Sequence, residues 1–287
     1  MEILFTGEWP LYVFYKQASQ EGNPMPKPLI FVLNLVIKCQ TGQVMERAAG
    51  LTYRVLLAFF PFLIFLMSLL GFMYLDTSAI LEPLYGVLPG DVAVLVADFL
   101  QGLEETRSRG LLSAGLFFSV YNSANGFRAI IRSANAAFDT RDERGIVKQV
   151  ALSIGMMLLF AVVIVVMLVL LVLGRHIWDL FVHDDLEVLF VPLSAAAALI
   201  VMIFATTLIY KLALAKKIRL RQVLPGAVIT VLAWAVSSGV FGFAITNFTQ
   251  YPAIYGSIAG VFILILWLNL VSVILLVGNE INALLAD

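Results

Sequence analysis

The chain has 287 residues, of which 61% are hydrophobic and only 13% are charged. A soluble globular domain carries about 25% charged residues, so this composition excludes a water-soluble globular protein and indicates an integral membrane protein. The net charge of −1 provides no basic excess for nucleic acid, and the single cysteine, Cys39, excludes an intrachain disulfide and a cysteine-based zinc cluster.

Residues 1–47 are expected to form a cytoplasmic and interfacial, amphipathic N-terminal segment. Within it, the stretch "LIFVLNLVIK" at 29–38 is apolar and is flanked by lysines. A helix of this length is too short to cross the roughly 30 Å of hydrocarbon in a bilayer. We therefore expect a helix that lies at the membrane surface.

Residues 48–287 are expected to form the membrane domain. Apolar runs of about 20 residues, the length that crosses a bilayer, recur along this part of the chain. Backbone polar groups in hydrocarbon must be hydrogen-bonded within their own segment, so each run should be a helix. The sequence predicts an all-α, polytopic membrane protein with six transmembrane helices, at about 48–74, 110–135, 150–174, 188–210, 223–247 and 253–285.

The outer loop at 75–109, between the first two predicted spans, contains an amphipathic pattern. Five apolar residues follow the spacing i, i+3, i+4, i+7 and i+11, which places them on one side of a helix; they are Val92, Leu95, Val96, Phe99 and Leu103. This spacing predicts outer amphipathic helical structure that lies on the membrane surface or caps the bundle.

Lysines and arginines are distributed unequally between the two sides of this predicted topology. With the amino terminus inside, 15 of the 18 basic residues fall in inner segments, and the outer loops hold the other three against ten acidic residues. Short cytoplasmic loops of membrane proteins are enriched in Lys and Arg, so both termini are predicted to be cytoplasmic.

Three separated stretches resemble the YihY/BrkB family of bacterial inner-membrane proteins. They are "AAGLTYRVLLAFFPFLIF" at 48–65, "YNSANGFRAIIRSANAAFD" at 121–139 with the "ERG" that follows, and "YGSIAGVFILILWLNLVSVILLVGNEINA" at 255–283. The resemblance implies six helices, cytoplasmic termini, an outer loop of short helices, and a multi-pass protein of the bacterial inner membrane. Members have been labelled tRNA-processing ribonucleases or linked to virulence or envelope transport, so the resemblance implies architecture more than activity.

A polar stripe marks the inner end of the second predicted span. Its members are separated by 3, 4, 3 and 4 residues, which confines them to one face of a helix; they are Asn125, Arg128, Arg132, Asn135 and Asp139. The arginines either extend to lipid headgroups or belong to a polar wall that faces neighbouring helices, because an asparagine that faces lipid has no partner. The sequence leaves both readings open.

Glu280 is the one charged residue between Arg221 and Asp287, and it lies at the depth predicted for Arg128 and Arg132. An unpaired carboxylate in the membrane costs free energy, so we expect Glu280 to pair with Arg132 or Arg128. The pair would be a structural clamp or part of a gate. Tyr255 and Asn269 share the helical stripe of Glu280 and would continue a polar track.

Two further features of the predicted spans have both a structural and a functional interpretation. Arg54, about two turns inside the first span, extends to the headgroups or joins the same inner cavity. Small residues four apart, Ser238 with Gly242 and Gly256 with Gly260, are typical of close helix packing within one chain or across a dimer. A homo-oligomer is therefore an open alternative.

The stretch "KLALAKKIRLR" at 211–221 holds five basic residues and no acidic one. Each such cation near an anionic membrane surface contributes about 1 kcal/mol of attraction. We expect membrane lipids as partners, with anionic headgroups bound at Lys211, Lys216, Lys217, Arg219 and Arg221. Nucleic acid is not expected, because aromatic residues are not interleaved with these cations.

Catalytic and metal-binding patterns are weak in this sequence. His176, Asp179 and His183 have the spacing of one helical face, but they occupy an acidic connection between spans, where a solvated loop is the favoured interpretation. The inner side offers no histidine for a metal site or a general base. No Walker loop or nucleophile elbow is present. We expect neither a cofactor nor a metal, and we expect that the chain is not an enzyme.

Three functional classes remain, of which an intramembrane enzyme is the least favoured. The first is a transporter or exporter of lipid-like or anionic amphiphilic substrates, with a polar cavity that faces the cytoplasm. The second is a non-transporting membrane scaffold or envelope-assembly protein, in which side chains fill the polar stripe. The residues predicted to line the cavity are Asn122, Asn125, Arg128, Arg132, Asn135, Arg54, Tyr255, Asn269 and Glu280.

Overall fold

A computed structural model describes residues 27–72, 93–94, 96–98, 109–181, 187–247 and 258–286. Within these ranges every regular element is a helix and none is a strand, which confirms the predicted all-α class. The helices are α2 (Lys27–Thr41), α3 (Val44–Phe72), α6 (Arg109–Ala137), α7 (Ile146–Phe181), α8 (Glu187–Ala213), α9 (Leu220–Asn247) and α11 (Ile258–Ala286).

Five of these helices contain a segment that is long and apolar enough to cross a membrane. The segments lie in α3, α7, α8, α9 and α11, so the chain is a polytopic membrane protein. α6 has 29 residues, about 44 Å at 1.5 Å per residue, and is long enough to cross, but its serines, asparagines and arginines lower its hydropathy. It corresponds to the predicted span 110–135.

The helices extend beyond most of the predicted spans. α3 begins at Val44 rather than at 48, and α7 continues to Phe181, where the prediction ended the span at 174. Residues 175–181 therefore form the last turns of a 36-residue helix and not a loop. The segment "RHIWDLF" contains neither Pro nor Gly, so polar residues alone do not end the helix.

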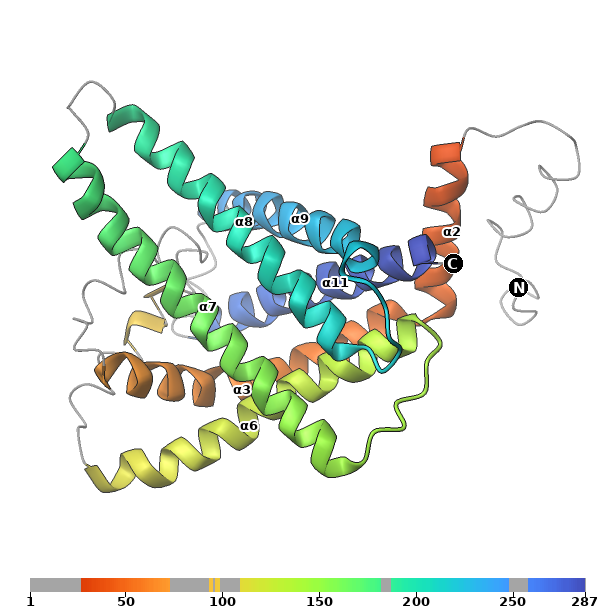
Figure 1. Cartoon of the computed structure of the whole chain (residues 1–287), viewed down its shortest axis with the longest axis horizontal. Helices are drawn as coiled ribbons and strands as arrows, with labels where there is room; N and C mark the ends of the chain where they lie inside the picture. Colours follow the sequence, from red (N-terminus) through yellow and green to blue (C-terminus); the bar gives the residue numbers. More distant parts are fainter. Residues whose placement is uncertain are drawn as a thin grey trace, which may run out of the picture.

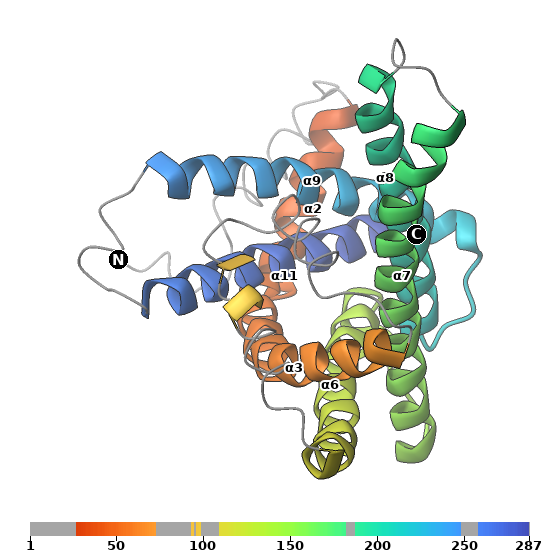
Figure 2. The ribbon, with the colours of Figure 1, turned by 90° about the vertical axis from the view of Figure 1, so that its left-hand side faces the viewer.

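The long helices are arranged in three pairs. Within each pair the two helices are in contact: α3 with α6, α7 with α8, and α9 with α11. Figures 1 and 2 show that the pairs converge at one end of the molecule and diverge toward the other. We call the converging end the basic end; it contains the start of α3, the connections 138–145 and 214–219, and the last turn of α11.

α2 is too short to cross a membrane and packs against α11 and α3. It is steeply inclined to both helices (Figure 1), as expected for a helix that lies along a membrane surface. The turn between α2 and α3 contains Gln43 with φ of 50°, which is a left-handed conformation.

The described part of the outer loop agrees with its predicted amphipathic pattern. Val96 is fully buried and packs in one apolar cluster with Leu63 of α3 and Trp267 of α11, whereas Asp98 is exposed. This segment therefore covers α3 and α11 with its apolar side. The other four residues of the predicted stripe lie outside the described residues.

α9 and α11 cross at two glycines. A Cβ on Gly278 would overlap Thr230 Oγ1, and a Cβ on Gly226 would overlap the carbonyl oxygen of Gly278. Tyr210 of α8 joins this crossing, because its hydroxyl bonds Thr230 Oγ1 at 2.8 Å and donates to the carbonyl oxygen of Leu275 at 2.7 Å. At Gly242 the described structure shows no close packing within the chain, because a Cβ there would have no neighbour within 4 Å; packing across a dimer at this position stays a prediction.

Candidate functional site

An open groove of about 270 Å³ lies between α3 and α6 at the basic end. Each helix contributes residues at positions i, i+3, i+4 and i+7, so one face of α3 opposes one face of α6. The lining residues are Arg47, Gly50, Leu51 and Arg54 from α3, and Ala129, Arg132, Ser133 and Ala136 from α6. Small residues occupy half of these positions and leave the space between the helices open.

Three guanidinium groups line the groove, and two of them have no counter-charge. Arg54 and Arg132 are exposed, and neither side chain forms a hydrogen bond or an ion pair within the described part of the chain. Arg132 instead lies within electrostatic range of two further cations, Arg54 and Arg128. Like charges held close together repel, so this arrangement favours an anion between them.

The third groove arginine, Arg47, is neutralised by Glu280. Its Nη2 donates to Glu280 Oε1 at 2.6 Å, and its Nη1 donates to the carbonyl oxygen of Ser133 at 3.4 Å. The Glu280 side chain is almost wholly buried, with 2% of its surface exposed, whereas that of Arg47 is 20% exposed. Arg47 therefore connects α3, α6 and α11.

The prediction that Glu280 pairs with Arg132 or Arg128 was wrong. Arg128 and Arg132 lie on α6, but the carboxylate is reached by Arg47 from the first turn of α3. The helix begins at Val44 and not at 48, which places Arg47 inside the bundle end instead of in a preceding segment. Lys38 of α2 and Asp139 after α6 are the other charges that act on Glu280.

The turn between α2 and α3 closes over this ion pair. A Cβ on Gly42 would lie 2.7 Å from Arg47 Nη2 and 3.4 Å from Glu280 Oε1, so only glycine leaves room here. Cys39 of α2 is half-buried nearby; burial and the Glu280 carboxylate raise the pKa of its thiol, against the opposing effect of Arg47.

Arg128 has a different environment from its neighbour Arg132. Its guanidinium donates to Asn125 Oδ1 and lies over the ring of Tyr121, 5.7 Å from the ring centroid. Hydrogen bonding and cation–π attraction hold this cation on α6 itself. Arg128 does not line the groove, but its charge lies beside it.

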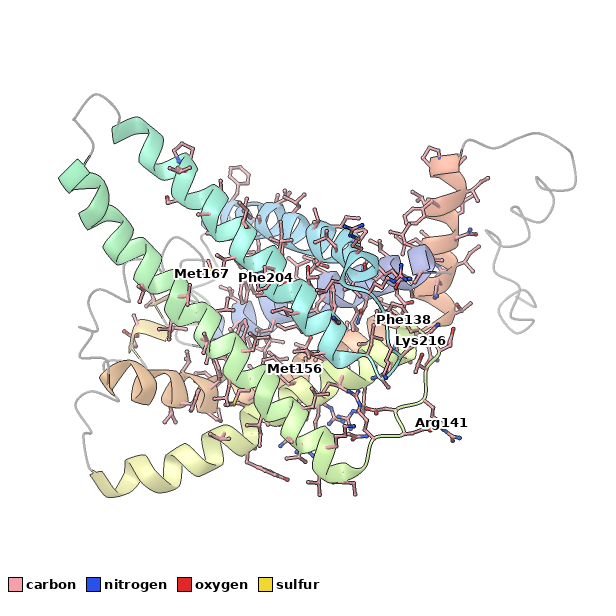
Figure 3. The ribbon with its side chains drawn as sticks, in the orientation of Figure 1. Phe138, Arg141, Met156, Met167, Phe204 and Lys216 are labelled. Carbon is pink, nitrogen blue, oxygen red and sulfur yellow. The ribbon has the colours of Figure 1, made fainter. Side chains whose placement is uncertain are left out.

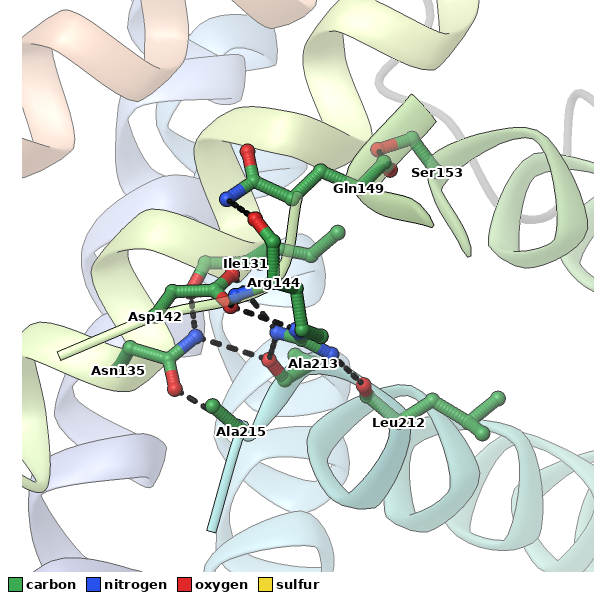
Figure 4. A network of polar contacts seen from close by, with 9 residues as sticks. All are labelled: Ile131, Asn135, Asp142, Arg144, Gln149, Ser153, Leu212, Ala213 and Ala215. Carbon is green, nitrogen blue, oxygen red and sulfur yellow. Dashed lines mark hydrogen bonds and ion pairs between the residues drawn. The ribbon is translucent and has the colours of Figure 1, made fainter. Parts of the chain in front are cut away.

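Asn135 binds backbone groups and does not line the groove. Its Nδ2 donates to the carbonyl oxygens of Ile131 and Ala213 at 2.8 and 2.9 Å, and its Oδ1 accepts from the amide of Ala215 at 2.8 Å (Figure 4). The side chain is buried, and its contacts attach the end of α6 to the end of α8. Its role in this geometry is structural.

Arg144 completes this attachment from the connection 138–145. It donates from Nη2 to the carbonyl oxygen of Ala213 at 2.8 Å, and from Nε and Nη2 to the two carboxylate oxygens of Asp142 at 2.7 and 2.9 Å (Figure 4). These hydrogen bonds lower the pKa of the Asp142 carboxyl below its usual range.

Asp139, the last member of the predicted stripe, ends α6. Its φ is 47°, and its amide donates to the carbonyl oxygen of Ala136. The amide of Thr140 donates to the carbonyl oxygen of Asn135. This pair of bonds is a Schellman motif, in which glycine is the usual left-handed residue. The predicted stripe is therefore divided between a helix cap, a structural attachment and the groove.

The remaining predicted residues are dispersed. Asn269 of α11 donates to Thr52 Oγ1 of α3 at 3.3 Å, and Asn122 is half-buried on α6. Tyr255 lies outside the described residues. Of the nine predicted cavity residues, Arg54 and Arg132 line the groove, and Glu280 is in contact with it through Arg47.

Sequence reasoning missed Arg47 and the small residues of the groove. A signal was present, because Arg47 and Arg54 are seven residues apart, which is two helical turns and one face. Extending the helix start by one turn would have placed the pair Arg47–Arg54 opposite Arg132. The small residues Gly50, Ala129 and Ala136 give no comparable signal by themselves.

The other predicted interactions are only partly described. Lys211, Lys216, Lys217, Arg219 and Arg221 are exposed at the basic end, where Figure 3 also shows Lys216 and Arg141. Among the described residues no group of three His, Cys, Asp or Glu side chains could hold a metal ion. His176 and Asp179 lie on α7, their side chains are not described, and His183 lies outside the described residues.

Residues 36–287 match the protein family described as virulence factor BrkB. A ribonuclease-like protein, YfkH, of Bacillus subtilis is 34% identical over 246 residues, which cover 84% of this chain and 89% of that protein. A UPF0761 membrane protein of Kangiella koreensis is 26% identical over 252 residues, 86% of this chain and 62% of its own length. No solved structure matches.

Proposed function

We propose, from the premise that the chain belongs to the virulence factor BrkB family, that it is a membrane transporter of anionic amphiphiles. In this proposal the groove between α3 and α6 receives the charged headgroup of the substrate. Lipid-like molecules are the substrate class, and the protein lies in the bacterial inner membrane with the basic end in the cytoplasm.

The observation that carries the proposal is the pair of uncompensated guanidiniums. Arg54 and Arg132 face one groove from two different helices and have no carboxylate partner in the described structure. Arginine presents a planar fork of donors that matches carboxylate and phosphate oxygens. Cations that stabilised only the fold would be expected to pair with protein groups, as Arg47 and Arg144 do.

The position of the groove supports an amphiphile rather than a small soluble anion. Tyr53 and Leu57, which neighbour Arg54 along α3, are 64% and 56% exposed. They extend an apolar surface from the groove toward the middle of the helix. A molecule with one charged end and one apolar end would satisfy both parts of this surface.

A membrane scaffold is the alternative function, and specific contacts favour it. Arg47 with Glu280, Asn135 with Ala213, and Gly226 with Gly278 join helices through filled, close contacts. A protein that only organises partners in the membrane would need such clamps and no solute path. We infer in either case that the chain is not an enzyme, since its two histidines lie on the predicted outer side and leave no inner general base.

Flux measurements on the purified chain in proteoliposomes test the proposal. The probe is a fluorescent anionic lipid, with the neutral lipid that carries the same fluorophore as its comparison, and movement between leaflets is followed in both orientations of the protein. Arg132→Ala is expected to lower flux, and Arg141→Ala, at an exposed cation of the same end outside the groove, is the matched control. Equal flux for wild type, Arg132→Ala and empty vesicles would favour the scaffold.

A further inference from the structure

The net charge of the groove indicates which kind of anionic headgroup it would bind. Arg47 and Glu280 form a neutral pair at 2.6 Å. Lys38 and Asp139, the next charges near that pair, have opposite signs. Arg54 and Arg132 therefore leave two positive charges on the groove wall, and Arg128 beside them adds to the positive potential.

Two guanidiniums from opposite walls suit a group with several free oxygens. A phosphate monoester has three such oxygens and a charge of about −1.5 to −2 at neutral pH. A phosphodiester has two free oxygens and a single charge. With one arginine on each side, a monoester accepts charge-assisted hydrogen bonds from both walls at once and neutralises the two charges.

The size of the groove limits what enters it. A pocket for a drug-sized ligand occupies about 300–1,000 Å³ and encloses most of the ligand, whereas this groove has about 270 Å³ and is open on one side. It holds a headgroup, and the apolar part of the molecule must lie outside. Tyr53 and Leu57 on α3 and Tyr121 on α6 have exposed side chains outside the groove and offer a surface for that part.

We infer that the groove is a binding site for the terminal phosphate monoester of a membrane lipid, with Arg54 and Arg132 binding the phosphate from opposite helices. This inference rests on the proposed function and specifies its substrate class. The chains of the lipid lie against the apolar surface of α3 and α6, so a soluble phosphate, which lacks them, binds much more weakly.

Lipid binding to the full chain in nanodiscs tests this inference. The nanodiscs contain phosphatidylcholine with charge-matched amounts of phosphatidate, a monoester, or phosphatidylglycerol, a diester, and bound lipid is counted by native mass spectrometry. Phosphatidate is expected to bind about tenfold more tightly, because one further charge-assisted hydrogen bond exceeds 1.4 kcal/mol. Arg54→Gln and Arg132→Gln should remove this preference, and Arg141→Gln should retain it.

The outcomes separate this inference from the proposed function. Equal binding of phosphatidate and phosphatidylglycerol, with both above phosphatidylcholine, would overturn the monoester assignment and leave transport of anionic amphiphiles standing. Binding no stronger than that of phosphatidylcholine would overturn both. Displacement of phosphatidate by inorganic phosphate at equal concentration would assign the site to a soluble anion instead. Because the first comparison uses wild-type protein, it does not depend on the stability of any variant.

Discussion

Arg47 and Glu280, 233 positions apart in the sequence, form a 2.6 Å ion pair that connects the first turn of α3 with the last turns of α11. The same guanidinium reaches the carbonyl oxygen of Ser133 on α6 and forms one end of the groove wall. A structural clamp and a candidate binding site therefore share one side chain. This arrangement links the stability of the basic end to the charge of the groove.

Removal of one partner from this pair should destabilise the protein strongly. Glu280→Ala leaves the Arg47 guanidinium largely buried without its counter-charge, and breaking such a pair costs about 3–5 kcal/mol. Thermal unfolding in detergent, followed by loss of the monodisperse peak, measures the effect. The double variant Arg47→Met with Glu280→Met should recover most of the loss, and Glu143→Gln, in an exposed loop, should have no effect. A Glu280→Ala protein as stable as wild type would contradict the clamp.

The crossing of α9 and α11 should not tolerate a methyl group. Gly278→Ala forces the new Cβ into Thr230 Oγ1, and overpacking of this kind costs about 1–3 kcal/mol. The control is Gly155→Ala on α7, where a Cβ meets nothing within 4 Å and alanine favours the helix. A melting temperature lowered by Gly155→Ala but not by Gly278→Ala would exclude the proposed close crossing.

The Asp142–Arg144 pair should contribute a stability that depends on pH. Arg144 lowers the pKa of Asp142 in the folded protein, so the stabilisation is fully present above the unfolded pKa of about 3.9. It is lost as the pH falls through the lower folded value. The stability difference between wild type and Asp142→Asn should be constant near neutral pH and should shrink below about pH 4. A difference that grows on acidification would contradict this assignment.

Cys39 provides an internal probe for the position of α2. Burial and the nearby Glu280 raise the pKa of its thiol, and the thiolate is the reactive form. Maleimide labelling at neutral pH should therefore be slower than that of a free thiol. The labelling rate should increase as the pH rises. Arg47→Gln removes the cation that opposes this rise of the thiol pKa, so labelling of this variant should be slower still while α2 stays in place. Because Cys39 is the single cysteine, no background substitution is needed. Rapid labelling of wild type would mean that α2 is not docked.

Asn135 tests the division between structural and functional polar residues. Asn135→Ala removes hydrogen bonds to the end of α8 and leaves the amide of Ala215 unsatisfied, at a cost of about 1–3 kcal/mol. Thermal stability should fall, while the preference for phosphatidate among folded molecules should be unchanged. Loss of the preference at full stability would place Asn135 in the binding site and would contradict the geometry of Figure 4.

The sequence was sufficient to predict the class of fold. Long apolar runs and the requirement for internal hydrogen bonds fix helices, and each predicted span corresponds to a long helix in the described part of the chain. Helix ends were less predictable, because α7 continues through residues 175–181, which the prediction assigned to a loop. The left-handed residues Gln43 and Asp139, which end α2 and α6, carry no glycine signal in the sequence.

The candidate site was only partly predictable for a different reason. Helical spacing placed Arg128, Arg132 and Asn135 near one face, but spacing does not state which neighbour that face meets. Asn135 meets the end of α8, Arg128 meets residues of its own helix, and Arg132 meets open space beside α3. These differences arise from the packing of helices that are distant in sequence, and that packing is a tertiary property.

Photocrosslinking tests the central claim most directly. Phosphatidate that carries a diazirine near the start of its acyl chain is incorporated into nanodiscs with the 287-residue chain. After irradiation, the adducts are mapped by mass spectrometry. The account predicts adducts concentrated on α3 and α6 around Tyr53, Leu57 and Tyr121, and their loss in the double variant Arg54→Gln with Arg132→Gln but not in Arg141→Gln. Adducts spread evenly over all six long helices, or unchanged in the double variant, would contradict it.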